Sequence, residues 1–144
     1  MSSFLKEKYL DKEYETLSWE KAATAPISAI RGVSKQDSED LKKVFGIKSI
    51  RELAMNRYVL FAQGINLFSK TSGKILDKPF QSKEFDELRK KPISAIAGVS
   101  ETDAAVLKRA FSIKTIQELA ENKYVCIAQT ILNLAILEEM VNPM

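Results

Sequence analysis

The chain of 144 residues contains no histidine, one cysteine, five glycines and four prolines. Without histidine it lacks the commonest general base of enzymes and the commonest metal ligand. A single cysteine can form neither an internal disulfide nor a thiolate cage around a metal ion. A glycine-rich phosphate loop is missing as well, and Cys126 falls on an apolar stretch typical of a core position. We therefore expect no enzymatic activity, no cofactor and no metal site.

Long apolar runs are also missing from the sequence. No uninterrupted apolar stretch reaches the roughly 18 residues that a membrane-spanning helix needs. The first residues place Lys6, Glu7 and Lys8 where the apolar core of a signal peptide would lie. These features predict a cytoplasmic protein without membrane insertion.

What the chain does contain is a duplication. Residues 26–65 and 92–131 align without a gap at an offset of 92 − 26 = 66, and 24 of these 40 positions are identical. A repeat at a fixed offset is typical of tandem modules. We expect an all-α protein with an N-terminal helix (1–17), a first helical repeat (18–69), a linker (70–81) and a second repeat with an extended C-terminal helix (82–144).

Both repeats predict the same series of turns and helices. Gly32 and Gly98 fit a tight hairpin that requires positive φ. Gly46 fits the end of the following helix, and Ser112 replaces it in the second copy. Serine or threonine followed three residues later by an acid predicts a helix start at four places: Ser34–Asp37, Ser100–Asp103, Ser49–Glu52 and Thr115–Glu118. An apolar face among charged residues predicts one N-terminal helix over 3–16, and a longer helix follows from about Tyr58.

These signals together resemble the helix-hairpin-helix superfamily. The pattern is Ile-X-Gly-Val-Ser-X-X-Asp-X-X-X-Leu and then Phe-X-Ile-Lys-Ser/Thr-Ile-X-Glu-Leu-Ala, within 30–54 and 96–120. It is most similar to the tandem C-terminal repeats of the transcription factor NusA and to the C-terminal domain of the RNA polymerase alpha subunit. The resemblance implies tandem hairpin modules, which bind DNA in some proteins and other proteins elsewhere. Ser34 and Ser100 replace the second hairpin glycine of the DNA-binding members, and we expect no phosphate contacts in the second repeat.

The last helix carries apolar residues on two faces. One face contains Tyr124, Ala128, Ile131 and Ala135, and the second contains Ile127, Leu134, Leu137 and Val141. The first repeat shows no such apolar extension, and Val106 replaces Asp40 in the second repeat. We interpret Ile127, Leu134, Leu137, Val141 and Val106 as a surface for a protein partner or for self-association. The alternative is that the second face packs within the chain, on the N-terminal helix or the first repeat.

Nucleic acid is the alternative ligand. Residues 26–69 contain seven basic and four acidic residues (7 − 4 = +3), whereas four of each cancel in residues 92–135. Arg31, Lys35, Lys42 and Lys43 lie beside the first hairpin, where helix amides and cations can hold phosphate. Acids lie on the same helix, so these lysines also fit a solvated helix face. The sequence thus favours a non-catalytic adaptor or accessory subunit that binds protein. The alternative is non-specific nucleic-acid binding through the basic hairpin of the first repeat and the connector 70–91.

Overall fold

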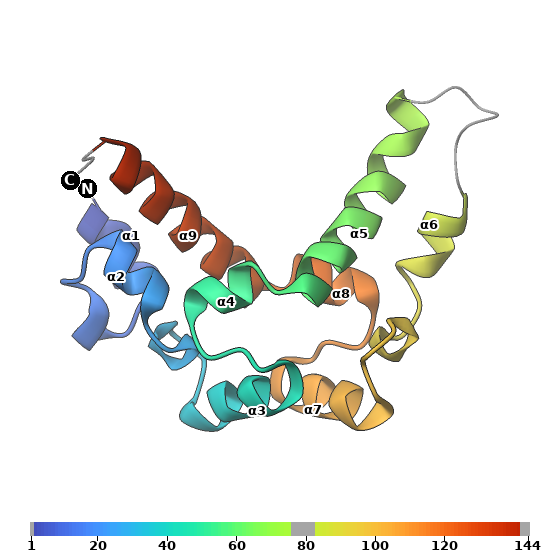
Figure 1. The fold of residues 1–144 in the computed structure, drawn as a ribbon, viewed down its shortest axis with the longest axis horizontal. Coiled ribbons are helices and arrows are strands. Elements are labelled where there is room, and N and C mark those ends of the chain that lie inside the picture. Colours follow the sequence, from blue (N-terminus) through green and yellow to red (C-terminus); the bar gives the residue numbers. More distant parts are fainter. Residues whose placement is uncertain (1, 76–82, 142–144) are drawn as a thin grey trace. The chain divides into compact units, whose positions relative to one another are not determined.

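A computed structural model describes residues 2–75 and 83–141 of the chain, and Figure 1 shows its helices. Within these residues no β-strand occurs, and the two isolated bridges join Leu10 to Ile30 and Pro92 to Thr115. The prediction of an all-α protein is confirmed. The first half of the chain contains α1 (Ser2–Tyr9), η1 (Lys12–Tyr14), α2 (Trp19–Thr24), η2 (Ile27–Ala29), α3 (Lys35–Phe45), α4 (Ile50–Ala54) and α5 (Arg57–Ile75). The second half contains α6 (Lys83–Leu88), η4 (Ile93–Ala95), α7 (Glu101–Phe111), α8 (Ile116–Glu121) and α9 (Lys123–Val141).

The order of elements from α2 to α5 recurs from α6 to α9. Helices α3 and α7 are both 11 residues long, and α5 and α9 are both 19 residues long. We call α2–α4 body 1, α6–α8 body 2, and α5 and α9 the closing helices. Two residues of the same repeat position, 66 apart in number, are called equivalent below.

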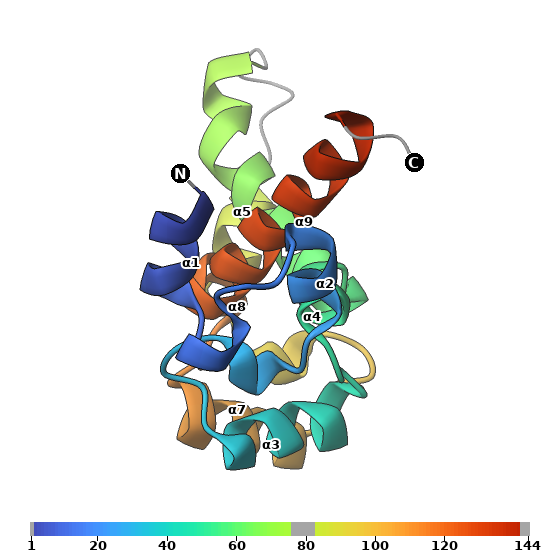
Figure 2. The same cartoon turned by 90° about the vertical axis from the view of Figure 1, so that its left-hand side faces the viewer.

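The packing divides the chain into two compact units that do not follow the order of the repeats. Unit 1 combines the residues up to Asn56 with those from Lys123 onward, and unit 2 is Arg57–Asn122. In unit 1 the closing helix α9 packs on α2 and α4 of body 1 (Figure 2). In unit 2 the closing helix α5 packs on α6 and α8 of body 2. Each closing helix therefore completes the body of the other repeat.

Residues that are identical in the two repeats form the contacts of both closing helices. The Gln129 side-chain amide donates to the Ala54 carbonyl at 3.1 Å, and the equivalent Gln63 donates to the Ala120 carbonyl at 3.3 Å. This pair of hydrogen bonds shows that each closing helix meets the other body in the same register.

Two equivalent tyrosines lie against the two hairpins in the same way. Gly32 has φ +92° and Gly98 has φ +94°, a conformation that favours glycine. A Cβ on Gly32 would lie 2.7 Å from the hydroxyl oxygen of Tyr124, and a Cβ on Gly98 would lie 2.7 Å from that of Tyr58. The hairpin glycines therefore serve both the turn and the close approach of a closing helix.

The predicted helix ends are largely confirmed. Ser34 with Asp37 and Ser100 with Asp103 form reciprocal capping boxes at the starts of α3 and α7. At α8, Thr115 and Glu118 form the third reciprocal box. At α4, Ser49 accepts from the Glu52 amide, while the Glu52 carboxylate accepts from the Lys48 amide at 2.6 Å instead. Gly46 and Ser112 both end their helices in the left-handed conformation.

The predicted N-terminal helix over 3–16 is wrong in length. Helix α1 ends at Tyr9, and the next residue, Leu10, is fully buried and forms a bridge with Ile30. The backbone leaves the helix there because it pairs with the hairpin: the Asp11 amide donates to the Ala29 carbonyl and the Arg31 amide donates to the Tyr9 carbonyl, at 2.8 and 2.9 Å.

The predicted start of the linker at residue 70 is also wrong. Helix α5 continues to Ile75, so the first part of the predicted linker 70–81 is helical, and the rest of it lies outside the described residues. Gly73 does not end α5, because a single glycine inside a helix costs only about 1 kcal/mol. The equal lengths of α5 and α9 leave their side chains as the main difference between them.

Candidate interaction surfaces

One side of α9 is fixed on body 1. Its buried residues are Val125, Ala128, Ile131, Leu132 and Ala135. Near its end the Glu138 carboxylate accepts from the backbone amides of Trp19 and Glu20 at the start of α2, at 3.4 and 3.2 Å. These contacts include three residues of the predicted packing face and determine which side of α9 is exposed.

The exposed side of α9 ends in a set of large apolar residues. Leu137 is 53% exposed, Met140 73% and Val141 67%, and we call these three residues the α9 apolar end. Ile136 lies at its edge and is 41% exposed. Leu137 and Val141 belong to the predicted partner surface, whereas Met140 was not predicted. Its spacing of three residues from Leu137 is the signal that could have placed it on this side.

The other residues of the predicted partner surface are not gathered there. Ile127 and Leu134 lie on α9 but are half-buried. Phe68, the residue equivalent to Leu134, contacts Phe85 with ring centroids 4.8 Å apart, which shows that this helix position faces a body. Val106 is half-buried on α7 and belongs to unit 2. For Leu134 the structure favours the alternative of packing within the chain.

Unit 2 carries an exposed apolar surface that the sequence analysis missed. Leu60 and Phe61 on α5 are 49% and 52% exposed. Phe61 lines an open hollow of about 440 Å³ with Arg57, Tyr58, Ile96 and Ala97, and the Arg57 guanidinium lies 4.9 Å from the Tyr58 ring. The signal in the sequence is that α5 has Leu60 where α9 has Cys126. The core position expected for Cys126 is wrong, because Cys126 is exposed.

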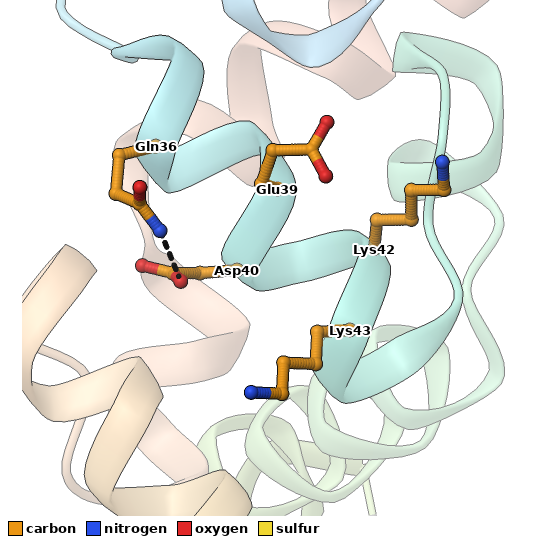
Figure 3. A pocket seen from close by; sticks show the side chains of 5 residues that line it. All are labelled: Gln36, Glu39, Asp40, Lys42 and Lys43. Carbon is orange, nitrogen blue, oxygen red and sulfur yellow. Dashed lines mark hydrogen bonds between the residues drawn. The ribbon is translucent and has the colours of Figure 1, made fainter.

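The predicted basic residues near the first hairpin are exposed but do not form a uniform positive patch. Lys42 and Lys43 line an open hollow on α3 together with Gln36, Glu39 and Asp40. Figure 3 shows Lys42 and Lys43 pointing away from each other, while Gln36 donates to the buried Asp40 carboxylate at 3.1 Å. The hollow is therefore lined by both charges.

The two remaining basic residues lie at other places of unit 1. Arg31 donates to the Leu10 carbonyl at 3.0 Å and lies 3.6 Å from the Glu15 carboxylate. It therefore helps to hold the N-terminal segment on the hairpin. Lys35 is exposed at the first position of α3.

A polar network joins α5 to body 2. Asn66 is buried, and its amide donates to the Glu121 carboxylate at 2.9 Å, while the Lys70 ammonium lies 2.6 Å from the same carboxylate. The Arg89 guanidinium donates to the side-chain oxygen Oδ1 of Asn66 at 3.4 Å and lies 3.0 Å from the Asp86 carboxylate. Ser69 donates to Asp86 at 3.1 Å. We call these six residues the polar network.

The two carboxylates of the polar network are stabilised in their charged form. Hydrogen bonds from Ser69 and Arg89 lower the pKa of Asp86 below its ordinary value of 3.8. Hydrogen bonds from Lys70 and Asn66 lower the pKa of Glu121 below its ordinary value of 4.5. A lowered pKa in the folded state links the network to stability at neutral pH.

A metal site and a membrane-spanning helix are two other kinds of functional feature. In residues 2–75 and 83–141 no three His, Cys, Asp or Glu side chains gather where they could hold a metal ion. By length and composition alone, α9 could cross a membrane. The same composition suits a helix that buries one side in a protein, as α9 does in unit 1.

Comparison with known proteins gives no relative from which a function could be transferred. The chain matches no protein-family model, no curated protein and no solved structure. The function is therefore argued from the surfaces described above.

Proposed function

We propose that the protein is a non-catalytic interaction module that binds another protein through the α9 apolar end. The observation that supports this proposal is the exposure of Leu137, Met140 and Val141, at 53–73%, on a helix whose opposite side is buried. Apolar side chains that are gathered on one exposed face are typical of a protein interface. Their spacing of three and four residues fits an amphipathic helix of the partner, laid along α9.

The charge beside this surface suggests what flanks the partner helix. Glu139 is exposed between Leu137 and Met140, and Lys123 at the other end is the sole cation of α9. We therefore expect the partner to present an apolar helix face bordered by lysine or arginine. Such complementary charges mainly speed association and fix its register.

The test is co-purification with two matched variants. Leu137→Asp should abolish the co-purification of one partner protein in a fixed ratio, because it places a carboxylate in the apolar end. Asn133→Asp adds the same charge one turn earlier on the exposed side and should leave recovery unchanged. The purified pair should then bind directly, with the affinity lowered about 100-fold by Leu137→Asp, as for a hot-spot residue.

Equal recovery with both variants would contradict the proposal. Two further results would assign the surfaces differently. Dimerisation of the purified chain that Leu137→Asp removes would make the apolar end a self-contact. Salt-sensitive binding to duplex DNA that Lys35→Glu with Lys42→Glu removes would favour a nucleic-acid function.

A further inference from the structure

At equivalent positions, the contact between closing helix and body is polar in unit 2 and mainly apolar in unit 1. In unit 2 the polar network places Asn66, Ser69 and Lys70 of α5 against Asp86, Arg89 and Glu121 of body 2. In unit 1 the equivalent residues of α9 are Leu132, Ala135 and Ile136, and those of body 1 are Glu20, Ala23 and Met55. Leu132, Ala135 and Ala23 are buried. Apart from Glu20, whose amide donates to Glu138, these positions of unit 1 are apolar.

The contacts that are shared by both units cannot decide which body a closing helix selects. Gln63 and Gln129 are equivalent and identical, and so are the alanines, Ala120 and Ala54, whose carbonyls accept their hydrogen bonds. Tyr58 and Tyr124 are also equivalent and identical. Either closing helix could therefore form these contacts on either body. Only positions that differ between the repeats can distinguish the exchanged packing from packing on the helix's own repeat.

The positions that differ favour the exchange in both directions. On body 1, Asn66 would lie against Ala23 and Met55, which offer its buried amide no side-chain partner. On body 2, Leu132 would take the place of Asn66 and leave Arg89 and Glu121 without its hydrogen bonds. We propose that the polar network and its apolar equivalents in unit 1 select the helix-exchanged packing over packing of each closing helix on its own body.

This proposal is independent of the partner surface, and a variant of the 144-residue chain tests it. Three residues are traded between the helices: Asn66→Leu, Ser69→Ala and Lys70→Ile in α5, with Leu132→Asn, Ala135→Ser and Ile136→Lys in α9. The amino-acid composition stays the same and both bodies are unchanged. If the proposal holds, each closing helix of this variant packs on its own body.

Nuclear Overhauser effects at the hairpin glycines report which packing is present. In the natural chain the Tyr124 ring lies against Gly32 and the Tyr58 ring lies against Gly98. The traded variant should instead show the Tyr58 ring against Gly32 and the Tyr124 ring against Gly98. If the natural pattern persists, the short connections after α4 and α8 enforce the exchange and the proposal is wrong.

A second experiment decides the matter if the traded variant does not fold. Leu132→Asn alone should lower the unfolding midpoint by about 5 °C or more, because it puts an amide into the apolar contact of unit 1. Adding Met55→Glu supplies the equivalent of Glu121 as a partner for the new amide. This double variant should regain at least half of the lost unfolding midpoint. Adding Thr130→Glu, an acid on the exposed side of α9, should restore none of it. Equal recovery, or none, in the two double variants would overturn the proposal.

Discussion

Equivalent residues end α3 and α7 in the left-handed conformation, but only one of them is glycine. Gly46 has φ 70° and Ser112 has φ 58°, and Ser112 is the one positive-φ residue other than glycine within 2–75 and 83–141. The Gly46 amide donates to the carbonyls of Leu41 and Lys42, and the Ser112 amide donates to the equivalent carbonyls of Leu107 and Lys108. The left-handed region costs a residue with a Cβ about 1–2 kcal/mol, so α7 ends under strain that α3 avoids.

This difference predicts opposite effects of two reciprocal substitutions. Ser112→Gly should raise the free energy of unfolding by roughly 0.5–1 kcal/mol, because strain relief exceeds the added freedom of the unfolded chain. Gly46→Ser should lower it by a similar amount, since a Cβ on Gly46 meets no heavy atom within 4 Å and only the backbone conformation changes in energy. Urea denaturation of both variants measures the two values. Two changes of the same sign would refute the explanation.

Most features at this scale were predictable from the sequence because their causes are local. The capping boxes at Ser34 and Ser100 need only residues three positions apart, and the positive φ of Gly32 needs only a tight turn. The exposure of Met140 agrees with its spacing of three residues from Leu137 on the same helix. Of the predicted partner surface, Leu137 and Val141 are exposed, whereas Ile127 and Leu134 are half-buried, a difference that the helical spacing alone does not predict.

At the scale of elements, the contact between α5 and α8 depends on the charge of Glu121. Hydrogen bonds from Lys70 and Asn66 lower its pKa below 4.5, and Gln117 contributes less. A carboxyl group with a lowered pKa in the folded state adds stability above its unfolded pKa. That stability is lost as the pH falls through the lowered folded value. The stabilisation should therefore be complete at neutral pH and disappear in acid below pH 4.5.

The variant Glu121→Gln isolates this effect. The difference in unfolding free energy between the natural chain and the variant should be constant from pH 7 to 6 and shrink as the pH falls below 4.5. The shrinkage should be smaller in a Lys70→Met background, where the largest cause of the lowered pKa is gone and the hydrogen bond from Asn66 remains. Chemical denaturation at a series of pH values measures both, and a difference that is independent of pH would contradict the assignment.

The element boundaries that the sequence misplaced are those set by contacts distant in sequence. The apolar pattern over 3–16 continues past Tyr9, yet the helix stops because Leu10 pairs with Ile30. The glycine and polar residues near 70–75 look like a linker, yet α5 continues to Ile75, and its residues Asn66 and Lys70 pair with Glu121 of α8. Neither contact can be predicted from the residues that are adjacent in the sequence.

For the whole molecule, the residues that are identical in the two repeats are those that a closing helix needs to pack on either body. They do not record which body it uses, because the shared residues fit both arrangements equally. The fold class could thus be predicted from periodicity and caps, while the exchange of α5 and α9 could not. The information lies in positions such as Asn66 and Leu132, where the repeats differ.

The exchange itself predicts which residues are energetically coupled. Gly32→Ala should destabilise the chain by about 1–2 kcal/mol through its positive φ, with a further cost because the new Cβ meets the Tyr124 hydroxyl at 2.7 Å. Removing that hydroxyl with Tyr124→Phe should recover the second part only. A double-mutant cycle should give a coupling of roughly 0.5–1 kcal/mol between these two residues, which are in direct contact.

A matched double-mutant cycle uses Tyr58→Phe in place of Tyr124→Phe. Tyr58 lies on α5, the helix that follows body 1 in the chain. Tyr58 lies against Gly98, so Gly32→Ala with Tyr58→Phe should be additive, and Gly98→Ala with Tyr58→Phe should be coupled. The two glycines have nearly the same φ, so backbone strain is equal and cancels between the cycles. Coupling of Gly32 to Tyr58 in place of Tyr124 would mean that each closing helix packs on its own repeat, which the helix-exchanged fold forbids.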